Sequence, residues 1–130
     1  MRVRLGPYRK NRAVNIEIEP HDTWNMDETL AHIIHPMLIQ LKQTKHGSPI
    51  VDDGDLPLDM GMSDEAKVKF SETGETDAQF HARWDWVLNE MIWAFEQKIL
   101  DADGSMEDEY YSRMSNGFRL FGKYYEALWD

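Results

Sequence analysis

The sequence predicts a mainly α-helical (α+β) protein with a three-helix core, a small N-terminal β-hairpin and a long acidic loop between the first two helices. Alternating apolar and polar residues near the start favour strands, and later apolar residues spaced three and four apart favour helices. Glycine, proline and acidic residues crowd the stretch between the first two helical patterns. With 130 residues and 42% hydrophobic content, the chain fits one domain.

Residues 1–20 are expected to form the hairpin, because "RVRL" and "AVNIEIE" alternate and a Gly-Pro and a basic turn lie between them. The basic residues of 1–12 could bind an acidic partner, including the acidic middle of this same protein. No apolar secretory segment follows this basic start, and no apolar run approaches the roughly 20 residues that span a bilayer. The absence of cysteine favours a reducing, intracellular environment.

The first helix is expected over 26–45, where Leu30, Ile34 and Leu41 recur at helical spacing, with a kink or break possible at Pro36. An acidic, linker-like loop follows over 46–76, partly ordered and partly mobile. Residues 52–77 carry nine acidic residues against two lysines. Because such a segment repels nucleic-acid phosphates, direct nucleic-acid binding is not expected.

The second helix is expected over 77–100. Trp84 falls within its apolar stripe and is assigned to the core, whereas Trp86 and Trp93 lie on nearly the opposite side. These two indoles indicate a second interface. The favoured interpretation is packing on both sides of the helix or self-association into a homo-oligomer. The alternatives are stacking on a nucleobase-like ligand or a hot spot for a partner protein.

The third helix is expected over 107–128, from apolar residues at spacings of three and four, with Gly117 and Gly122 weakening it. The preceding "DADGSMEDE", residues 101–109, does not fit an EF-hand calcium loop. Counted from Asp101, glycine stands fourth rather than sixth and serine stands twelfth. A helix-breaking turn is expected there.

Several long stretches resemble a family of small, uncharacterised tailed-bacteriophage proteins. The matching phrases are "DTWNMDETLAHIIHPML", "KHGSPIVDD", "RWDWVLNEMIWAFEQ" and "SNGFRLFGKYYEALWD". The resemblance covers residues 22–53 and 80–130, and it carries over no catalytic motif. It implies a protein that works in the cytoplasm of an infected bacterium. It also favours a binder that blocks or sequesters a host molecule.

The third helix places Asn116, Arg119, Lys123 and Tyr124 close together on one side. Arginine forks onto phosphate, lysine supplies a mobile charge and asparagine reads an amide or base edge, so this set is the candidate ligand site. Salt bridges to Glu126 or to the acidic loop explain the same cations equally well. The further ligand-binding candidates, at helix ends that flank the acidic loop or on the second helix, are Lys45, Arg83, Trp86 and Trp93.

The histidine pair His32 and His35, with Glu28 one turn earlier, is a weak candidate for Zn²⁺, Mn²⁺ or Ni²⁺. An ordinary polar helix face is favoured, and binding of an anionic ligand by histidine and lysine is the other alternative. No other cofactor is expected. The chain lacks cysteine, a G-x-S-x-G motif and a glycine-rich phosphate loop, so a non-enzyme is favoured over an enzyme.

The sequence therefore leaves three hypotheses for the function. The first is a non-catalytic phage protein that sequesters a small nucleotide-type host molecule to defeat defence signalling, with Trp86 or Trp93 stacking the base and Arg119, Lys123 and Lys45 holding phosphates. The alternative is an acidic inhibitor or DNA mimic directed at a host protein. The second alternative is a metal-dependent phosphohydrolase centred on His32 and His35.

Overall fold

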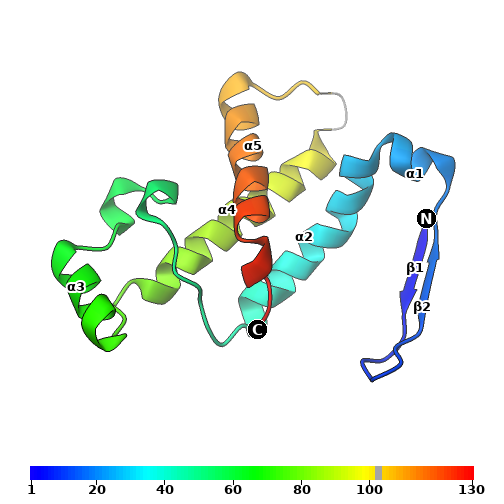
Figure 1. Ribbon diagram of the computed structural model, residues 1–130. Coiled ribbons are helices and arrows are strands. Elements are labelled where there is room, and N and C mark those ends of the chain that lie inside the picture. The colour runs from blue at the N-terminus through cyan, green and yellow to red at the C-terminus, as the bar shows by residue number, and fades with distance from the viewer. Residues whose placement is uncertain (102–103) are drawn as a thin grey trace.

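The computed structural model describes residues 1–101 and 104–130, which form a helical body with a two-stranded hairpin at one end and a smaller helical lobe at the other (Figure 1). The mainly helical class and the N-terminal hairpin are confirmed. The turn expected over 101–109 lies partly outside the described residues. Along the described ranges, none of the helices combines the length and apolar character needed to cross a lipid bilayer.

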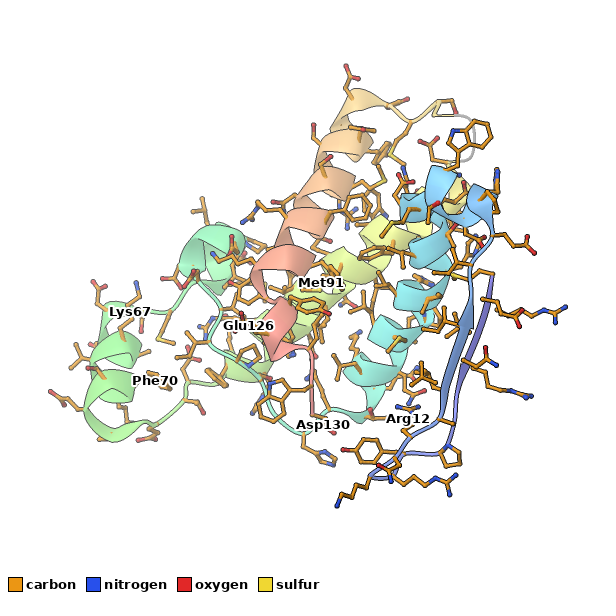
Figure 2. All side chains as sticks on the ribbon, turned by 45° about the vertical axis from the view of Figure 1, so that its right-hand side comes forward. Arg12, Lys67, Phe70, Met91, Glu126 and Asp130 are labelled. Carbon is orange, nitrogen blue, oxygen red and sulfur yellow. The ribbon has the colours of Figure 1, made fainter. Side chains whose placement is uncertain are left out.

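Strands β1 (Arg2–Leu5) and β2 (Val14–Glu17) pair antiparallel, with Val3 opposite Ile16 and Leu5 opposite Val14. The turn between them is closed by a hydrogen bond of 2.8 Å from the Gly6 amide to the Ala13 carbonyl. All strand residues are exposed, and the hairpin runs alongside the helical body without joining its core (Figure 2).

Two helices follow the hairpin. Helix α1 (Pro20–Trp24) is a single short turn that opens on proline, and helix α2 (Met26–Thr44) continues through Pro36 without a break. Helix α2 buries Ala31 and Leu38 on the side that packs against α4. Helix α2 starts at the expected residue 26 and ends at Thr44, one residue before the expected residue 45.

Helix α4 (Phe80–Leu100) is the centre of the body, with α2 and α5 packed against it. Its fully buried residues recur at helical spacing, as an amphipathic helix with a wide core face requires. The core residues of α4 are Trp84, Val87, Leu88, Met91, Ala94 and Phe95. Trp84 is 2% exposed, so its assignment to the core is confirmed. The helix starts three residues after the expected residue 77.

Helix α5 (Asp108–Lys123) crosses α4 at a very short distance that Gly117 makes possible. A Cβ atom on Gly117 would lie 2.4 Å from the Ala94 Cβ and 2.8 Å from the Glu90 carbonyl oxygen, far inside van der Waals contact. The sequence predicts only that this glycine weakens the helix. In the structure it also permits the closest approach between α4 and α5.

Helix α5 ends earlier than the expected residue 128. After Lys123 the backbone leaves the α-helical conformation at Tyr124 (φ −101°, ψ 17°), and a 3₁₀ turn, η3 (Tyr125–Ala127), carries the chain to its end. This early end places Tyr124 in the core, where its ring meets Trp84 edge-on at 5.8 Å between centroids.

The segment expected to be a loop over 46–76 is largely structured. It contains two 3₁₀ turns, η1 (Asp53–Asp55) and η2 (Leu58–Met60), and helix α3 (Asp64–Thr73). The Ser63 hydroxyl caps α3 by accepting the Ala66 N–H at 3.2 Å, and Gly74 ends it in the left-handed conformation (φ 73°). The sequence did not predict this helix, because none of its residues is fully buried and the helix therefore has no apolar stripe. We call residues 52–77 the acidic lobe.

Candidate functional site

The carboxylate of Asp55 is the centre of a polar cluster between the acidic lobe and α5. Lys123 Nζ donates to Asp55 Oδ2 at 2.6 Å, and the Tyr124 hydroxyl donates to the same oxygen at 2.7 Å. Arg119 Nη2 donates to Asp55 Oδ1 at 2.8 Å. Asp55 is only 9% exposed, so these three donors satisfy a carboxylate that is almost removed from water.

The sequence brings these donors together by helical spacing. Arg119 and Lys123 are four residues apart on α5 and share one face, and Tyr124 follows directly at the end of the helix. Asn116 Oδ1 accepts from Arg119 Nε at 2.9 Å, which orients the guanidinium. Lys123 also contacts Asp52 Oδ2 at 2.7 Å, and the Asp52 amide donates to the Tyr124 hydroxyl oxygen at 3.0 Å.

The electrostatics of this cluster fix its charge state. Burial alone would raise the pKa of Asp55, but hydrogen bonds from Lys123, Tyr124 and Arg119 outweigh it and lower that pKa from 3.8 to about 2. Hydrogen bonds to Asp52 and Asp55 raise the pKa of Lys123 well above its usual value. Burial, followed by the bond to Asp55, raises the pKa of Tyr124. Asp55 is therefore a permanent carboxylate at neutral pH.

The cluster unites four of the residues predicted from the sequence, and it shows what they bind within the chain. Arg119, Lys123 and Tyr124 converge on Asp55 rather than on an open pocket, and Asn116 joins them through its bond to Arg119. The second interpretation of these cations, salt bridges to the acidic segment, matches the observed contacts. Asp55 itself is one of the nine acids of residues 52–77, and no local pattern singles it out.

Arg83 forms a second attachment of the acidic lobe. Its side chain is 3% exposed, and Nη1 and Nη2 donate to the two oxygens of Asp77 at 2.7 and 2.6 Å. Its Nε donates to the Met60 carbonyl at 2.6 Å. This paired hydrogen bonding is the main reason that the pKa of Asp77 is lowered. Arg83 thus binds the lobe at two points of its chain rather than an external anion.

The other predicted cation at a helix end, Lys45, forms an ion pair with Asp85 at 2.9 Å. The two candidate tryptophans are covered within the chain. Trp86 is half-buried and packs against the core. Trp93 is half-buried under the Arg113 guanidinium, whose carbon lies 4.0 Å from the ring centroid.

Sequence reasoning missed Arg113. Its Nε and Nη2 donate to the two carboxylate oxygens of Glu90 at 3.0 and 2.7 Å while its guanidinium covers Trp93. Tyr110 lies on the same indole at 6.3 Å between centroids. Arg113 belongs to the polar residues of the third helix, and these residues were interpreted only as an anion site. Side chains of α5 therefore cover part of the Trp93 indole on the second side of α4.

His32 and His35 do not form a metal site with a third ligand in the described part of the chain. Among residues 1–101 and 104–130, no group of three or more histidine and acidic side chains lies close enough to hold a metal ion. His32 is exposed and His35 is half-buried on α2. The side chain of Glu28, the expected third ligand, accepts instead from Asn25 Nδ2.

A small cavity of about 240 Å³ lies between the chain end and the segment after α2. Its lining residues are Gly47, Ser48, Pro49, Trp84, Ala127, Trp129 and Asp130. Trp129 is 75% exposed, and the Ser48 hydroxyl is hydrogen-bonded to His81 Nδ1 at 2.8 Å. The sequence analysis did not single out Trp129, because it stands outside any periodic stripe.

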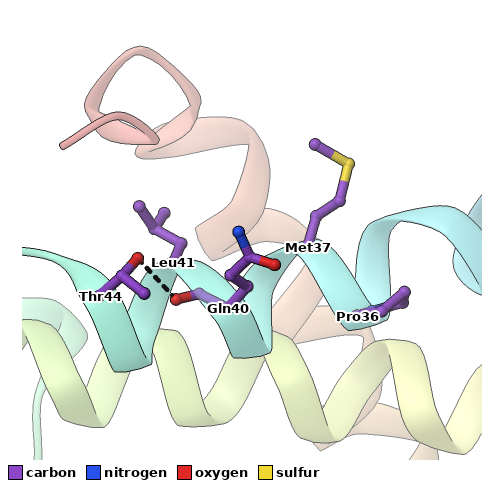
Figure 3. A pocket seen from close by; sticks show the side chains of 5 residues that line it. All are labelled: Pro36, Met37, Gln40, Leu41 and Thr44. Carbon is purple, nitrogen blue, oxygen red and sulfur yellow. Dashed lines mark hydrogen bonds between the residues drawn. The ribbon is translucent and has the colours of Figure 1, made fainter. Parts of the chain in front are cut away.

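Two shallow grooves lie on helix surfaces. One, of about 320 Å³, runs along α2 and is lined by Pro36, Met37, Gln40, Leu41 and Thr44 (Figure 3). The other, of about 400 Å³, runs along α3 in the acidic lobe and is lined by Asp64, Glu65, Val68, Lys69 and Glu72. The α3 groove is the more informative of the two, because it combines charge with the exposed side chain of Val68.

The acids of the lobe fall into two groups. Five of the nine form ion pairs: Asp52, Asp53, Asp55, Glu75 and Asp77. The remaining four are exposed and form no ion pair with any residue of the described ranges: Asp59, Asp64, Glu65 and Glu72. Three of these four line the α3 groove. Asp52, Asp55 and Asp77 therefore attach the lobe to α5 and α4, whereas Asp53 and Glu75 pair with lysines inside the lobe and the other four acids face solvent.

No protein-family model matches the chain, and neither a curated protein nor a solved structure does so. The resemblance to tailed-bacteriophage proteins stays a prediction from the quoted stretches.

Proposed function

We propose that this protein is a non-catalytic binding protein whose acidic lobe docks on a basic surface of another protein. One observation carries the proposal: the α3 groove presents Asp64, Glu65 and Glu72 without ion pairs in the described chain, around the exposed Val68. Rows of carboxylates that flank an apolar side chain fit a partner with lysine and arginine around an apolar spot.

The attachments of the lobe support this role. Asp55 joins it to α5 and Arg83 joins it to α4, so the free carboxylates stand on an anchored support. A surface held in place before binding loses less conformational entropy when a partner docks. A basic protein surface that normally binds nucleic-acid phosphates has the matching charge. In an infected bacterium, which the phage resemblance implies, such a surface would belong to a host protein.

The test is a triple neutralisation of the groove, Asp64→Asn, Glu65→Gln and Glu72→Gln. Partners captured from bacterial lysate by the wild-type protein are purified, and their affinity is measured by calorimetry at low and high salt. We expect the triple variant to bind at least tenfold more weakly, and the wild-type affinity to fall as salt screens the charges.

The matched control removes three other exposed acids, Glu96→Gln, Glu109→Gln and Glu126→Gln, and so changes the net charge equally. This control is expected to bind as the wild type does. Equal affinity of the groove variant and the wild type would reject the α3 groove as the docking surface. Equal weakening in both variants would leave only a net-charge effect and reject a specific site.

A second candidate function is sequestration of a nucleotide-type molecule, and the cavity beside Trp84 and Trp129 favours it. An exposed indole at the mouth of a cavity of about 240 Å³ offers a stacking surface for a ring the size of a nucleobase. Titration with mononucleotides and cyclic dinucleotides, monitored by tryptophan fluorescence, tests this function. Quenching that saturates in the wild type and disappears in Trp129→Ala supports it, whereas an unchanged spectrum counts against it.

A further inference from the structure

The hairpin presents an apolar face that the described parts of the chain leave largely exposed. The strand register puts Val3 and Leu5 on the same face as Val14 and Ile16, and Ile18 continues that face beyond the strand. These five aliphatic side chains are between 46% and 63% exposed. An isolated two-stranded hairpin is only marginally stable in water, and a contiguous exposed apolar face marks an interaction surface. The hairpin therefore gains stability when a second surface covers this face.

The turn of the hairpin holds its excess positive charge. Residues 6–13 contain Arg9, Lys10 and Arg12 and no acid, a net charge of +3, whereas the basic and acidic side chains of residues 1–5 and 14–19 balance to zero. The chain's amino group is paired with Asp22 at 3.0 Å. The three turn cations are exposed and form no ion pair within the described ranges. A surface that covers this end of the hairpin therefore has to be acidic.

The acidic lobe is the most negative part of the molecule. Residues 1–19 hold five basic and two acidic residues, a net charge of +3, so the total of −10 leaves −13 on residues 20–130. The nine acids and two lysines of the lobe give −7, which is more than half of that charge on 26 residues. The basic turn is therefore attracted to an acidic lobe rather than to another basic turn.

Within the lobe, the α3 groove matches the hairpin in both charge and apolar character. Its acids Asp64, Glu65 and Glu72 equal the turn cations in number and form no ion pair in the described chain. Val68 lies in the same groove and is 55% exposed, so aliphatic side chains of the hairpin can pack on it while the turn cations meet the acids. Of the three hollows described above, this groove alone combines several unpaired acids with an apolar side chain.

The hairpin lies far from the α3 groove of its own chain. Figure 1 shows β1 and β2 at one end of the helical body and α3 at the other. The second view agrees, because Arg12 of the turn and Phe70 of α3 lie on opposite sides of the molecule (Figure 2). The groove that covers a hairpin is therefore that of another copy. Because every copy has both surfaces at opposite ends, two copies placed head to tail can make two such contacts.

We infer that the hairpin of one copy docks on the α3 groove of a second copy, with its apolar face over Val68 and its basic turn against the groove acids. The contact is heterologous, because two different surfaces meet. It rests on the proposed function, which assigns the α3 groove as a docking surface, so a docked hairpin and the basic partner protein exclude each other. The homo-oligomer that the sequence predicts at Trp86 and Trp93 forms instead through the hairpin and the lobe.

Reversal of charge on each surface tests the contact with the purified full chain. Arg9→Glu with Lys10→Glu reverses the turn, and Glu65→Lys with Glu72→Lys reverses the groove. In sedimentation velocity over a range of concentrations, we expect the wild type to associate and each reversed variant alone to associate roughly tenfold or more weakly. An equimolar mixture of the two variants should regain association. In the mixture, the natural hairpin of one variant meets the natural groove of the other, and the two reversed surfaces also attract each other.

The apolar face has a test of its own. Val3→Thr with Ile16→Thr removes aliphatic surface from a cross-strand pair without changing the charge, and it keeps the β-branched side chains that strands favour. This variant should also associate roughly tenfold more weakly than the wild type.

Matched controls place the same charge changes elsewhere. Arg4→Glu with Lys42→Glu removes two cations that lie outside the turn and the apolar face. Glu109→Lys with Glu126→Lys is the control for the groove, because Glu109 is the second residue of α5 as Glu65 is the second residue of α3. Both controls should associate as the wild type does. Helical circular dichroism of every variant checks that the body stays folded.

Three results would overturn the inference. The first is a wild-type protein that is monomeric at all concentrations. The second is a mixture of the two reversed variants, both folded, that does not regain association. The third is an equal loss of association in the reversed variants and in their controls, which would assign it to net charge.

The affinity for a captured basic partner is a separate measurement, made on the monomeric turn-reversed variant, whose groove is intact. A monomeric wild type whose groove variants still lose the partner overturns the self-association and leaves the proposed function standing. A mixture that regains association, together with partner binding that does not depend on the groove, supports the self-association and rejects the proposed function.

Discussion

The Asp55 carboxylate and the Lys123 ammonium, 68 residues apart in the chain, lie 2.6 Å from each other. This pair fastens the acidic lobe to the end of α5, and Arg119 and Tyr124 complete the cluster. Arg83 fastens the same lobe to α4, and Gly117 lets α5 cross α4 closely.

Replacing Asp55 by asparagine should destabilise the protein. The substitution leaves Arg119 without its carboxylate, leaves Lys123 with Asp52 alone and places an amide N–H₂ against donors, at an expected loss of about 1–3 kcal/mol in unfolding free energy. Urea denaturation measures the loss. Asp59→Asn is the control, because Asp59 is an exposed lobe acid without an ion pair in the described chain, and it should stay within about 0.5 kcal/mol of wild type. Equal stability of the two variants would contradict a stabilising role for the cluster.

The same carboxylate should make stability depend on acidity. Its pKa is about 2 in the folded protein against an ordinary value of 3.8, so its contribution is present above the higher value and is lost as pH falls toward the lower one. At about 1.4 kcal/mol for each pKa unit, this contribution is about 2 kcal/mol. Unfolding free energies between about pH 6 and pH 2 should therefore fall less steeply for Asp55→Asn than for wild type. Parallel curves would show that Asp55 does not titrate as described.

Substitution of Gly117 by alanine should force α5 away from α4. The new methyl group would lie 2.4 Å from the Ala94 Cβ, so we expect a loss of about 1–3 kcal/mol despite the better helix propensity of alanine. Gly122→Ala is the matched control on the same helix, because nothing lies within 4 Å of the position that its methyl group would take. It should gain up to about 1 kcal/mol. Thermal unfolding of both variants gives the comparison, and a stabilised Gly117→Ala would disprove the close crossing.

Replacing Arg83 by lysine should loosen the acidic lobe. Lysine cannot donate to both oxygens of Asp77 and to the Met60 carbonyl at once, so one buried acceptor loses its partner. We expect limited proteolysis to cut residues 56–79 at least several-fold faster. Arg113→Lys, at the more exposed two-bond pair with Glu90, should leave cleavage there unchanged. Equal protection of the lobe in both variants would argue against an anchoring role for Arg83.

The sequence predicted the helical class, the hairpin and the burial of Trp84 because each rests on a local period or alternation. Helix α3 was not predicted, because only its two ends carry a sequence signal, at Ser63 and Gly74. The residues between them form no apolar stripe. The set Asn116, Arg119, Lys123 and Tyr124 was found because helical spacing is local. Its partner Asp55 was not, because the choice of one acid among nine is made by tertiary packing.

The two attachments of the acidic lobe also affect its kinetics. When the Asp55 cluster opens, Arg83 still holds the other end of the lobe, so the released carboxylate stays at a high effective concentration near Lys123 and rebinds quickly. When the contacts of Arg83 break, the Asp55 cluster in the same way keeps the released groups close to Arg83. Complete detachment requires both events together, so partial openings should far outnumber it. In amide hydrogen exchange, the segment around Asp55 should therefore open separately from the two segments that Arg83 holds, at Met60 and at Asp77.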